Sequence, residues 1–155
     1  PTRAIVAPYQ VDARLCISYL TIELHGPIPA ALRPLMGNHI YGCDDCMMVC
    51  PWNRFATPSA ETDFLPRQGL ESATLSELFC WTKEEFLRRT EGSPIRRIGY
   101  ARWLRNIAVA LGNAPSSAAV VAALREKQGH PSALVREHVA WALEQHDRRG
   151  VSGDR

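Results

Sequence analysis

The chain has 155 residues, of which 46% are hydrophobic and 22% charged, values typical of a globular protein and unlike those of a disordered one. Apolar runs are too short for a membrane span of about 18 residues, and the first residues do not resemble a signal peptide, so we expect a cytoplasmic protein. The net charge of +2 is divided unevenly. Residues 1–82 carry five basic and eight acidic side chains (−3), whereas residues 83–155 carry thirteen and eight (+5). The second region is therefore the better candidate for contact with a polyanion, although basic, solvated helix faces would give the same balance.

The amino-terminal half has few regular elements. Residues 4–7 are a candidate strand, and residues 12–24 are predicted to form one helix that Asp12 caps. A short helical turn is expected within residues 29–36. Residues 52–69 lack sustained periodicity and contain prolines, so they are predicted to form an ordered connector.

Helical signals dominate from residue 72 onward. Two threonines have a glutamate three residues later, the spacing of a capping box at a helix start, namely Thr74 with Glu77 and Thr82 with Glu85. Three longer helices are expected at residues 94–112, 116–128 and 132–147, separated by Gly- and Pro-containing breaks. Antiparallel helix pairs of this length are typical of HEAT-like repeats.

Three of the five cysteines form a cluster, with the spacing C-x2-C-x3-C-P from Cys43 through Cys46 to Cys50. Such clustering is typical of metal binding in a reducing compartment rather than of a disulfide scaffold. The two-cluster ferredoxin pattern is C-x2-C-x2-C-x3-C-P, and its fourth cysteine binds the other cluster. Its first position falls here on Ile40, so Cys16 is the expected replacement. Cys16, Cys43 and Cys46 would then hold one cluster and Cys50 a second.

These assignments leave both clusters short of ligands. We expect a cysteine directly before Pro1 in the full protein, with three more cysteines upstream of it. Two alternatives stay open. All four cysteines could hold a single cluster, or zinc could bind the three clustered cysteines together with Cys16 or His39. Cys80 lies between two aromatic residues and is predicted to be a buried apolar side chain.

Two segments, RLCISYLTIELHGPIP and RPLMGNHIYGCDDCMMVCPWNRF, resemble the epoxyqueuosine reductases, cobalamin-dependent iron–sulfur enzymes of queuosine biosynthesis. The resemblance implies two 4Fe–4S clusters with the same division of the four cysteines. It also implies a cobalamin over the clusters, with Ser18 and Asp44 in the stretches that line it, and reduction of epoxyqueuosine to queuosine at the tRNA wobble position. That family's amino-terminal domain, which supplies most of the cobalamin pocket and the catalytic acid, has no counterpart here. The catalytic residue is therefore unknown, and this portion alone should be inactive.

A tRNA partner would need basic contacts. Arg88, Arg102, Arg105 and Arg136 are predicted to contact the tRNA backbone, where neutralised phosphates give salt-dependent affinity. Trp103 lies among these arginines, but its helical spacing with Ile107 and Leu111 places it in the core rather than against a base.

The sequence thus predicts a mainly α protein with a ferredoxin-like two-cluster iron–sulfur segment and a HEAT-like helical domain. The expected boundaries are residues 1–72 for the first, 73–149 for the second and 150–155 for a disordered tail. We expect a monomer that receives electrons from a flavodoxin or ferredoxin. A plain electron-transfer module and a zinc-stabilised nucleic-acid-binding module are the competing interpretations.

Overall fold

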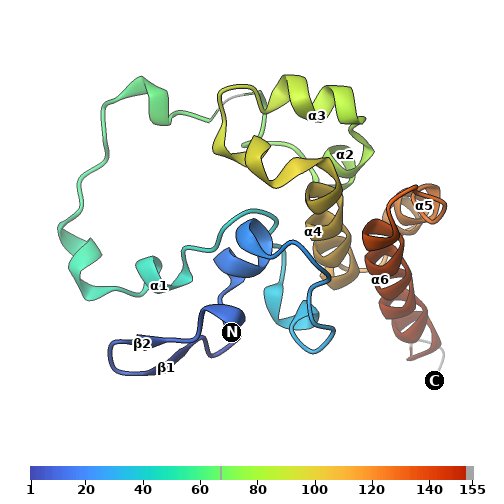
Figure 1. Cartoon of the computed structure of the whole chain (residues 1–155), viewed down its shortest axis with the longest axis horizontal. Coiled ribbons are helices and arrows are strands. Elements are labelled where there is room, and N and C mark those ends of the chain that lie inside the picture. The colour runs from blue at the N-terminus through green and yellow to red at the C-terminus, as the bar shows by residue number, and fades with distance from the viewer. Residues whose placement is uncertain (67, 153–155) are drawn as a thin grey trace.

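The computed structural model describes residues 1–66 and 68–152. The chain begins with a small antiparallel hairpin of β1 (Ile5–Ala7) and β2 (Gln10–Val11), in which Ile5 pairs with Val11. This hairpin confirms the predicted strand and lies at one edge of the molecule, away from the long helices (Figure 1).

The predicted helix over residues 12–24 is interrupted. Asp12 caps only a short 3-10 helix, η1 (Ala13–Leu15), and Cys16 is extended, with φ −73° and ψ 125°. The chain then enters a wide π-type turn, η2 (Tyr19–Glu23). Thr21 Oγ donates to the Ile17 carbonyl at 2.8 Å, a side-chain bond of the kind that competes with regular helical bonding. The interruption places Cys16 at a bend instead of on a helix face.

The middle of the chain is built from short turns. The 3-10 helix η3 (Arg33–Met36) confirms the turn predicted within residues 29–36. Three more follow, namely α1 (Asp45–Met48), η4 (Pro51–Phe55) and η5 (Thr62–Phe64). The connector after α1 forms an arch that stands away from the body of the molecule (Figure 1). Within residues 37–66 and 68–77 no residue is fully buried, and only its two ends, at Ile40–Cys43 and Leu70–Leu75, pack against the cores.

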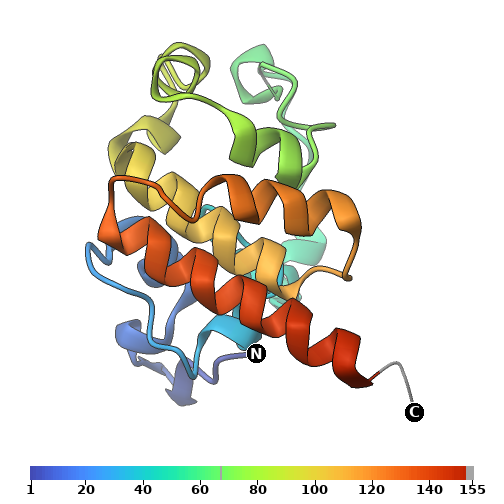
Figure 2. The ribbon, with the colours of Figure 1, turned by 90° about the vertical axis from the view of Figure 1, so that its right-hand side faces the viewer.

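The second half is helical, as predicted. Its elements are α2 (Leu75–Cys80), α3 (Lys83–Arg89), η6 (Pro94–Ile98), α4 (Gly99–Asn113), α5 (Ala118–Glu126) and α6 (Ala133–Ser152). Both predicted capping boxes are present, with the Thr74 hydroxyl accepting from Glu77 N–H and the Thr82 hydroxyl from Glu85 N–H. Helices α4, α5 and α6 lie side by side (Figure 2). The protein is therefore mainly α.

Three predictions about this half need correction. The helix expected over 94–112 is divided, because Gly99 has φ 72° and separates η6 from α4. Helix α6 continues to Ser152, which removes residues 150–152 from the predicted tail, and residues 153–155 lie outside the described residues. Cys80 is exposed rather than buried, because it lies on the outer side of α2 while Phe79 beside it fills the core.

Helix α4 belongs to two hydrophobic cores. The larger core joins α4 to α2, α3, α5 and α6, and includes Trp103, which stacks on Trp81 with ring centroids 5.7 Å apart. The smaller core places Val109 of α4 against apolar side chains from the amino-terminal segment, namely Ile17, Leu20, Ile28 and Met36. Trp103 is thus a core residue, as predicted. In the part of the chain that the structure describes, no helix has the length and apolar character needed to cross a membrane.

Candidate iron–sulfur site

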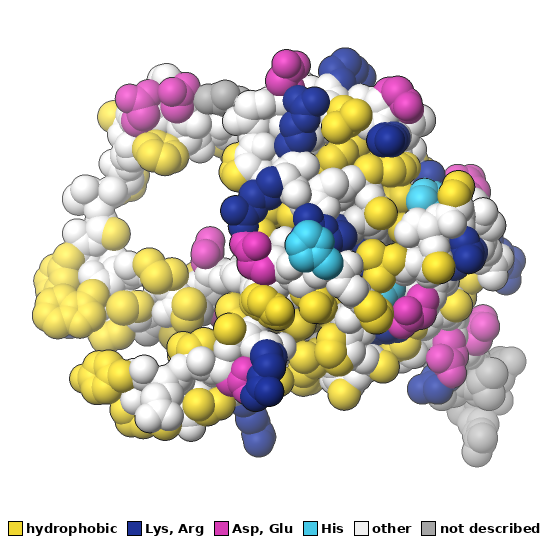
Figure 3. All heavy atoms as spheres, viewed as in Figure 1, with side chains coloured by type: hydrophobic (Ala, Val, Ile, Leu, Met, Phe, Trp, Pro, Cys, Tyr) yellow, Lys and Arg dark blue, Asp and Glu magenta, His cyan; other side chains and the backbone are white. Residues whose placement is uncertain are grey.

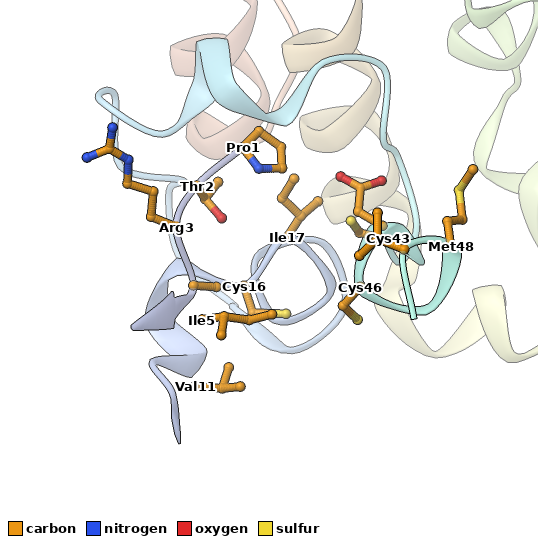
Figure 4. Close-up of a pocket in the computed structure, with 13 residues that line it drawn as sticks. Pro1, Thr2, Arg3, Ile5, Val11, Cys16, Ile17, Cys43, Cys46 and Met48 are labelled. Carbon is orange, nitrogen blue, oxygen red and sulfur yellow. The ribbon is translucent and has the colours of Figure 1, made fainter. Parts of the chain in front are cut away.

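One cavity of about 560 Å³ gathers three of the four predicted cysteine ligands (Figure 4). Cys16 comes from the amino-terminal segment, and Cys43 and Cys46 come from the cysteine motif. Cys50 is not among the residues that line this cavity. The structure therefore brings together the three cysteines assigned to one cluster and separates the cysteine assigned to the other.

Local backbone geometry explains where each thiol lies. Cys16 occupies the extended residue between η1 and η2. Gly42 precedes Cys43 with φ 74°, a left-handed conformation that glycine adopts without strain, and it turns the chain into the cavity. Cys46 lies in the single turn of α1, whereas Cys50 is extended and precedes Pro51, which redirects the chain. The spacing of the motif thus directs Cys43 and Cys46 into the cavity and leaves Cys50 outside it.

Two hydroxyls from η2 and the residues before it hold the Cys43 loop. The backbone N–H of Gly42 donates to Thr21 Oγ at 3.0 Å, and the N–H of Cys43 donates to Ser18 Oγ at 2.9 Å. Ser18 Oγ in turn donates to the Cys43 carbonyl at 3.3 Å. The segment that follows Cys16 is therefore bonded directly to the segment that carries Cys43.

The surroundings of Cys43 favour the protonated thiol when no metal is bound. Burial raises the pKa of Cys43, and this outweighs the opposing effect of a hydrogen bond from the Asp45 backbone. A metal that binds Cys43 must displace this proton, so occupancy of the site should rise with pH.

A second donor set overlaps the first. His39, Cys43 and Asp45 place their ligand atoms within 4.8 Å of one another. His39 Nδ1 lies 2.8 Å from the Met36 carbonyl and Nε2 lies 3.4 Å from Asp45 Oδ1. Such a set of nitrogen, sulfur and oxygen donors can bind zinc, but it shares only His39 and Cys43 with the predicted zinc site and has Asp45 in place of Cys46 and Cys50.

The donor chemistry of the cavity fits an iron–sulfur cluster. A 4Fe–4S cluster is held by four cysteine thiolates, and the described residues supply three of them to this cavity. Apolar side chains, among them Ile5, Val11 and Ile17, form much of the remaining wall. Such a wall limits the access of water to a bound cluster, which is one of the ways in which a protein adjusts cluster potential.

The two predicted cobalamin contacts differ in their surroundings. Ser18 is half-buried, and its hydroxyl is bonded to the backbone of Cys43. Asp44 is exposed at the start of α1 and is absent from the cavity wall, where its neighbour Asp45 lies instead. The sequence did not distinguish these two adjacent carboxylates, because only the turn of α1 decides which one faces inward.

The four arginines predicted to contact tRNA also differ. Arg88 and Arg136 are exposed on α3 and α6. Arg102 is half-buried and donates to the carbonyls of Ile98, Ile22 and Arg97. Figure 3 shows basic side chains on the face of the helical domain that borders the arch.

The prediction for Arg105 is wrong. Its side chain is 0% exposed and donates to the carbonyls of Leu20, Leu24 and Gly26, so it cannot reach a phosphate in this structure. Burial lowers the pKa of Arg105 to about 10, with a smaller contribution from nearby Arg102. The guanidinium is still charged at neutral pH and serves to join α4 to the amino-terminal segment.

Sequence reasoning missed Asn106, the residue after Arg105. Its side-chain amide is buried and donates to the carbonyls of Thr21 at 2.9 Å and Ile40 at 2.8 Å. These contacts join residues 85 and 66 positions apart in the chain. The available signal was a polar pair, Arg105-Asn106, in an otherwise apolar helix face.

Known proteins resemble this chain both in the cysteine-containing segment and over nearly its whole length. Residues 1–53 match the family model of a 4Fe–4S double cluster binding domain. The chain is 64% identical over 146 residues to the epoxyqueuosine reductase of Pseudomonas aeruginosa, covering 94% of this chain and 40% of that protein. It is 61% identical over 150 residues to the epoxyqueuosine reductase of Escherichia coli, covering 96% and 39%. The chain thus spans about 40% of the length of these curated relatives.

The fold is also similar to a solved structure. A crystal structure of epoxyqueuosine reductase with an epoxyqueuosine-modified tRNA-Tyr stem loop superposes with a TM-score of 0.85 at 30% identity, covering 94% of this chain and 39% of that one. The similarity in sequence and the similarity in fold therefore cover nearly all residues of this chain. Over the portion that it spans, the chain is therefore similar in sequence and in fold to the epoxyqueuosine reductases.

Proposed function

We propose that this protein forms the cluster-binding part of an oxidoreductase that reduces epoxyqueuosine to queuosine at the wobble position of a tRNA. Conversion of the epoxide to the cyclopentene consumes two electrons and two protons and releases water. The observation that carries the proposal is the arrangement of Cys16, Cys43 and Cys46 on one cavity, in a chain related over 94% of its length to epoxyqueuosine reductases.

Two 4Fe–4S clusters are part of this proposal. Cys16, Cys43 and Cys46 hold one cluster and Cys50 ligates the other, and cysteines upstream of Pro1 complete both. The match of residues 1–53 to a double-cluster domain supports this division, as does the position of Cys50 outside the shared cavity. When bound, the clusters supply one-electron transfer. The chain's own residues hold the thiolates, fix the Cys43 loop and limit the access of water.

The remaining partners are proposed for the whole protein. Cobalamin binds the full-length enzyme, with Ser18 and Asp44 as predicted contacts, and a flavodoxin or ferredoxin supplies electrons. Residues 1–72 form the cluster segment and residues 73–149 a HEAT-like domain, in a cytoplasmic monomer. We further propose that the 155-residue portion alone is inactive, because the whole relatives are about two and a half times longer.

Exposed arginines of the helical domain provide the proposed tRNA contacts. Arg88 and Arg136 remain candidates, since both are exposed and lie in the half of the chain with a balance of +5. Within the described residues, only Nη1 of Arg136 is engaged, by the carbonyls of His130 and Pro131. Arg102 is a weaker candidate, because three carbonyls already accept from its guanidinium. A solved relative carries a tRNA stem loop, which supports a tRNA partner for the whole protein.

The test is anaerobic reconstitution with iron and sulfide of the protein that includes the upstream region, followed by metal analysis and an activity assay. We expect a broad absorbance band near ~400 nm, iron for two clusters, and conversion of epoxyqueuosine tRNA once cobalamin and a reductant are added. A colourless protein that contains zinc would overturn the redox function and favour the donor set of His39, Cys43 and Asp45. Clusters without tRNA binding or turnover would favour the plain electron-transfer module.

A further inference from the structure

The buried side chain of Asn106 connects the two segments that carry Cys16 and Cys43. We propose that Asn106, Thr21 and Ser18 form a clamp that fixes the separation of these two thiols, so that helix α4 positions the ligands of the cluster. The part of the proposal that concerns the cluster rests on the proposed function. The part that concerns the positions of the thiols does not.

The amide of Asn106 spans both segments. Its Nδ2 donates to the carbonyl of Thr21, five residues after Cys16, at 2.9 Å. It also donates to the carbonyl of Ile40, three residues before Cys43, at 2.8 Å. Because both protons of one planar group are used, the two carbonyls are held at a set distance from each other.

Arg105 prevents the Asn106 amide from rotating. Asn106 Oδ1 accepts from Arg105 Nε at 3.0 Å and from Nη2 at 2.9 Å, and Nη2 also donates to the Leu20 carbonyl at 2.8 Å. A flipped amide would turn its NH2 group toward the guanidinium and its oxygen toward two carbonyls. All four contacts would then be repulsive, in a site that is 0% exposed.

Two hydroxyls extend the clamp to the cysteine itself. Thr21 Oγ accepts from Gly42 N–H, and Ser18 Oγ accepts from Cys43 N–H. The hydroxyl bond to Cys43 also engages an N–H that would otherwise be free to donate to a cluster sulfur. Hydrogen bonds to cluster sulfurs affect the reduction potential, so removal of the Ser18 hydroxyl should change the spectroscopic properties as well as the geometry.

Polar contacts matter here because apolar packing around the motif is only partial, with Ile40 and Tyr41 against the larger core and Cys43 against the smaller one. Cys43, Cys46 and Cys50 lie within the stretch in which no described residue is buried. The last fully buried member of the smaller core before the motif is Met36, and Cys43 packs against that core only as a partly buried side chain. The hydrogen bonds of the clamp add to these partial contacts and set the distance between the Cys16 and Cys43 segments.

Helix α4 also contains a matched control. Asn113 lies seven residues after Asn106, and its Nδ2 likewise donates to two backbone carbonyls, those of Arg33 at 2.8 Å and Gly37 at 2.9 Å. Arg33 and Gly37 lie outside both segments that the clamp connects, residues 16–21 and residues 40–43. Replacement of Asn113 thus removes an equal number of similar bonds away from the thiols.

The first test needs no iron. The reduced chain is treated with dibromobimane, a short reagent that bridges two thiols, and the Cys16–Cys43 product is quantified by peptide mass spectrometry. We expect Asn106→Asp, which keeps the volume but loses both donors, to lower the yield several-fold, and Asn113→Asp to leave it unchanged. Thr21→Val, which removes only the hydroxyl, serves as the second variant if Asn106→Asp does not fold.

The second test uses the reconstituted full-length protein. Loss of outer-shell partners of metal ligands typically costs roughly 10–100-fold in metal affinity, so we expect at least about tenfold faster loss of iron to a chelator in the clamp variants. The electron paramagnetic resonance spectrum of the reduced cluster should change in Ser18→Ala and not in Asn113→Asp.

The outcomes separate the two proposals. The clamp would be overturned if neither asparagine variant changed the cross-linking yield relative to wild type, or if both lowered it equally. A decrease confined to the clamp variants in a protein that takes up no iron would uphold the positioning of the thiols and overturn the proposed function. A protein that binds iron and releases it at the same rate in all variants would overturn the role of the clamp at the cluster.

Discussion

The helical domain and the cysteine motif are held in place by different forces. Residues of α2 to α6 enclose a core that includes Phe79, Phe86, Trp103 and Leu124, each at most 1% exposed. Residues 37–66 and 68–77 contain no buried residue, although they include three of the predicted cluster ligands. Burial of apolar surface stabilises the first region, at about 25 cal/mol per Å². The second has only partly buried apolar contacts, and depends in addition on hydrogen bonds from its neighbours and, in our proposal, on metal.

This difference suggests why α4 extends beyond the core of its own domain. One face contributes Trp103 and Leu111 to the larger core. Another face carries Arg105 and Asn106, whose polar groups bond to the backbone of the amino-terminal segment. A helix stabilised by packing can thus order a neighbouring segment that has little packing of its own.

The largest expected effect tests whether the cysteine motif binds iron in two separate clusters. In the reconstituted full-length protein, Cys43→Ala and Cys50→Ala should each remove about half of the iron, because each affects a different cluster. The helical domain should retain its helical circular dichroism. Cys80→Ala is the control, since Cys80 is exposed on α2 and is not among the residues that line the cavity. Loss of all metal from Cys43→Ala and none from Cys50→Ala would instead indicate a single site.

The next largest effect concerns a histidine between the two regions. His138 of α6 is 0% exposed; its Nε2 accepts from Ile28 N–H at 3.1 Å, and its Nδ1 lies 2.7 Å from the Leu134 carbonyl. Burial lowers the pKa of His138 from 6.5 to about 4. Between these values the unfolded chain binds a proton that the folded chain does not. Stability is therefore retained above pH 6.5 and falls as the pH decreases toward 4.

The pH dependence due to His138 should amount to about 3 kcal/mol in the free energy of unfolding. Urea unfolding at a series of pH values, with wild type and His138→Gln, would measure it. We expect a flatter profile in the variant, because glutamine can accept from Ile28 N–H and does not titrate. Parallel profiles would show that His138 is not the group responsible.

A smaller effect tests the packing of the helical domain. A Cβ at Gly112 of α4 would lie 2.5 Å from Trp141 Cζ3 and 3.0 Å from the Cα of Ala142, both on α6. Gly112→Ala should therefore force the helices apart and lower stability by about 1–3 kcal/mol in thermal unfolding. Gly129→Ala provides the control, since no heavy atom lies within 4 Å of the added Cβ. Equal stability of the two variants would contradict the close approach of α4 and α6.

The smallest effect concerns a single capping box. Thr74 accepts from Glu77 N–H at 3.2 Å, and Glu77 accepts from Thr74 N–H at 2.7 Å. Thr74→Ala should lower the unfolding free energy by about 1 kcal/mol, as is usual for loss of an N-cap. Thr74→Ser keeps the hydroxyl and should retain most of that stability. The yield of the Cys16–Cys43 cross-link should not change in Thr74→Ala, because the bonds of this capping box join only Thr74 and Glu77.

Local patterns could be predicted from the sequence. Both capping boxes, the division into an irregular first half and a helical second half, and the core position of Trp103 follow from residues a few positions apart. The cysteine spacing likewise predicts that Cys50 binds apart from Cys43 and Cys46, and the proline after Cys50 predicts the bend in the chain there. These features rest on short-range sterics and hydrogen bonding, which depend little on the rest of the chain.

Tertiary structure decided what the sequence could not. The meeting of Cys16 with Cys43 and Cys46 on one cavity and the burial of Arg105 both depend on segments that meet only in the folded chain. Arg105 is of a residue type that usually lies at the surface, yet it donates hydrogen bonds to backbone carbonyls up to 85 positions away. Its role is therefore set by which backbone groups lack partners after folding, and a buried carbonyl without a donor is costly wherever it lies in the sequence.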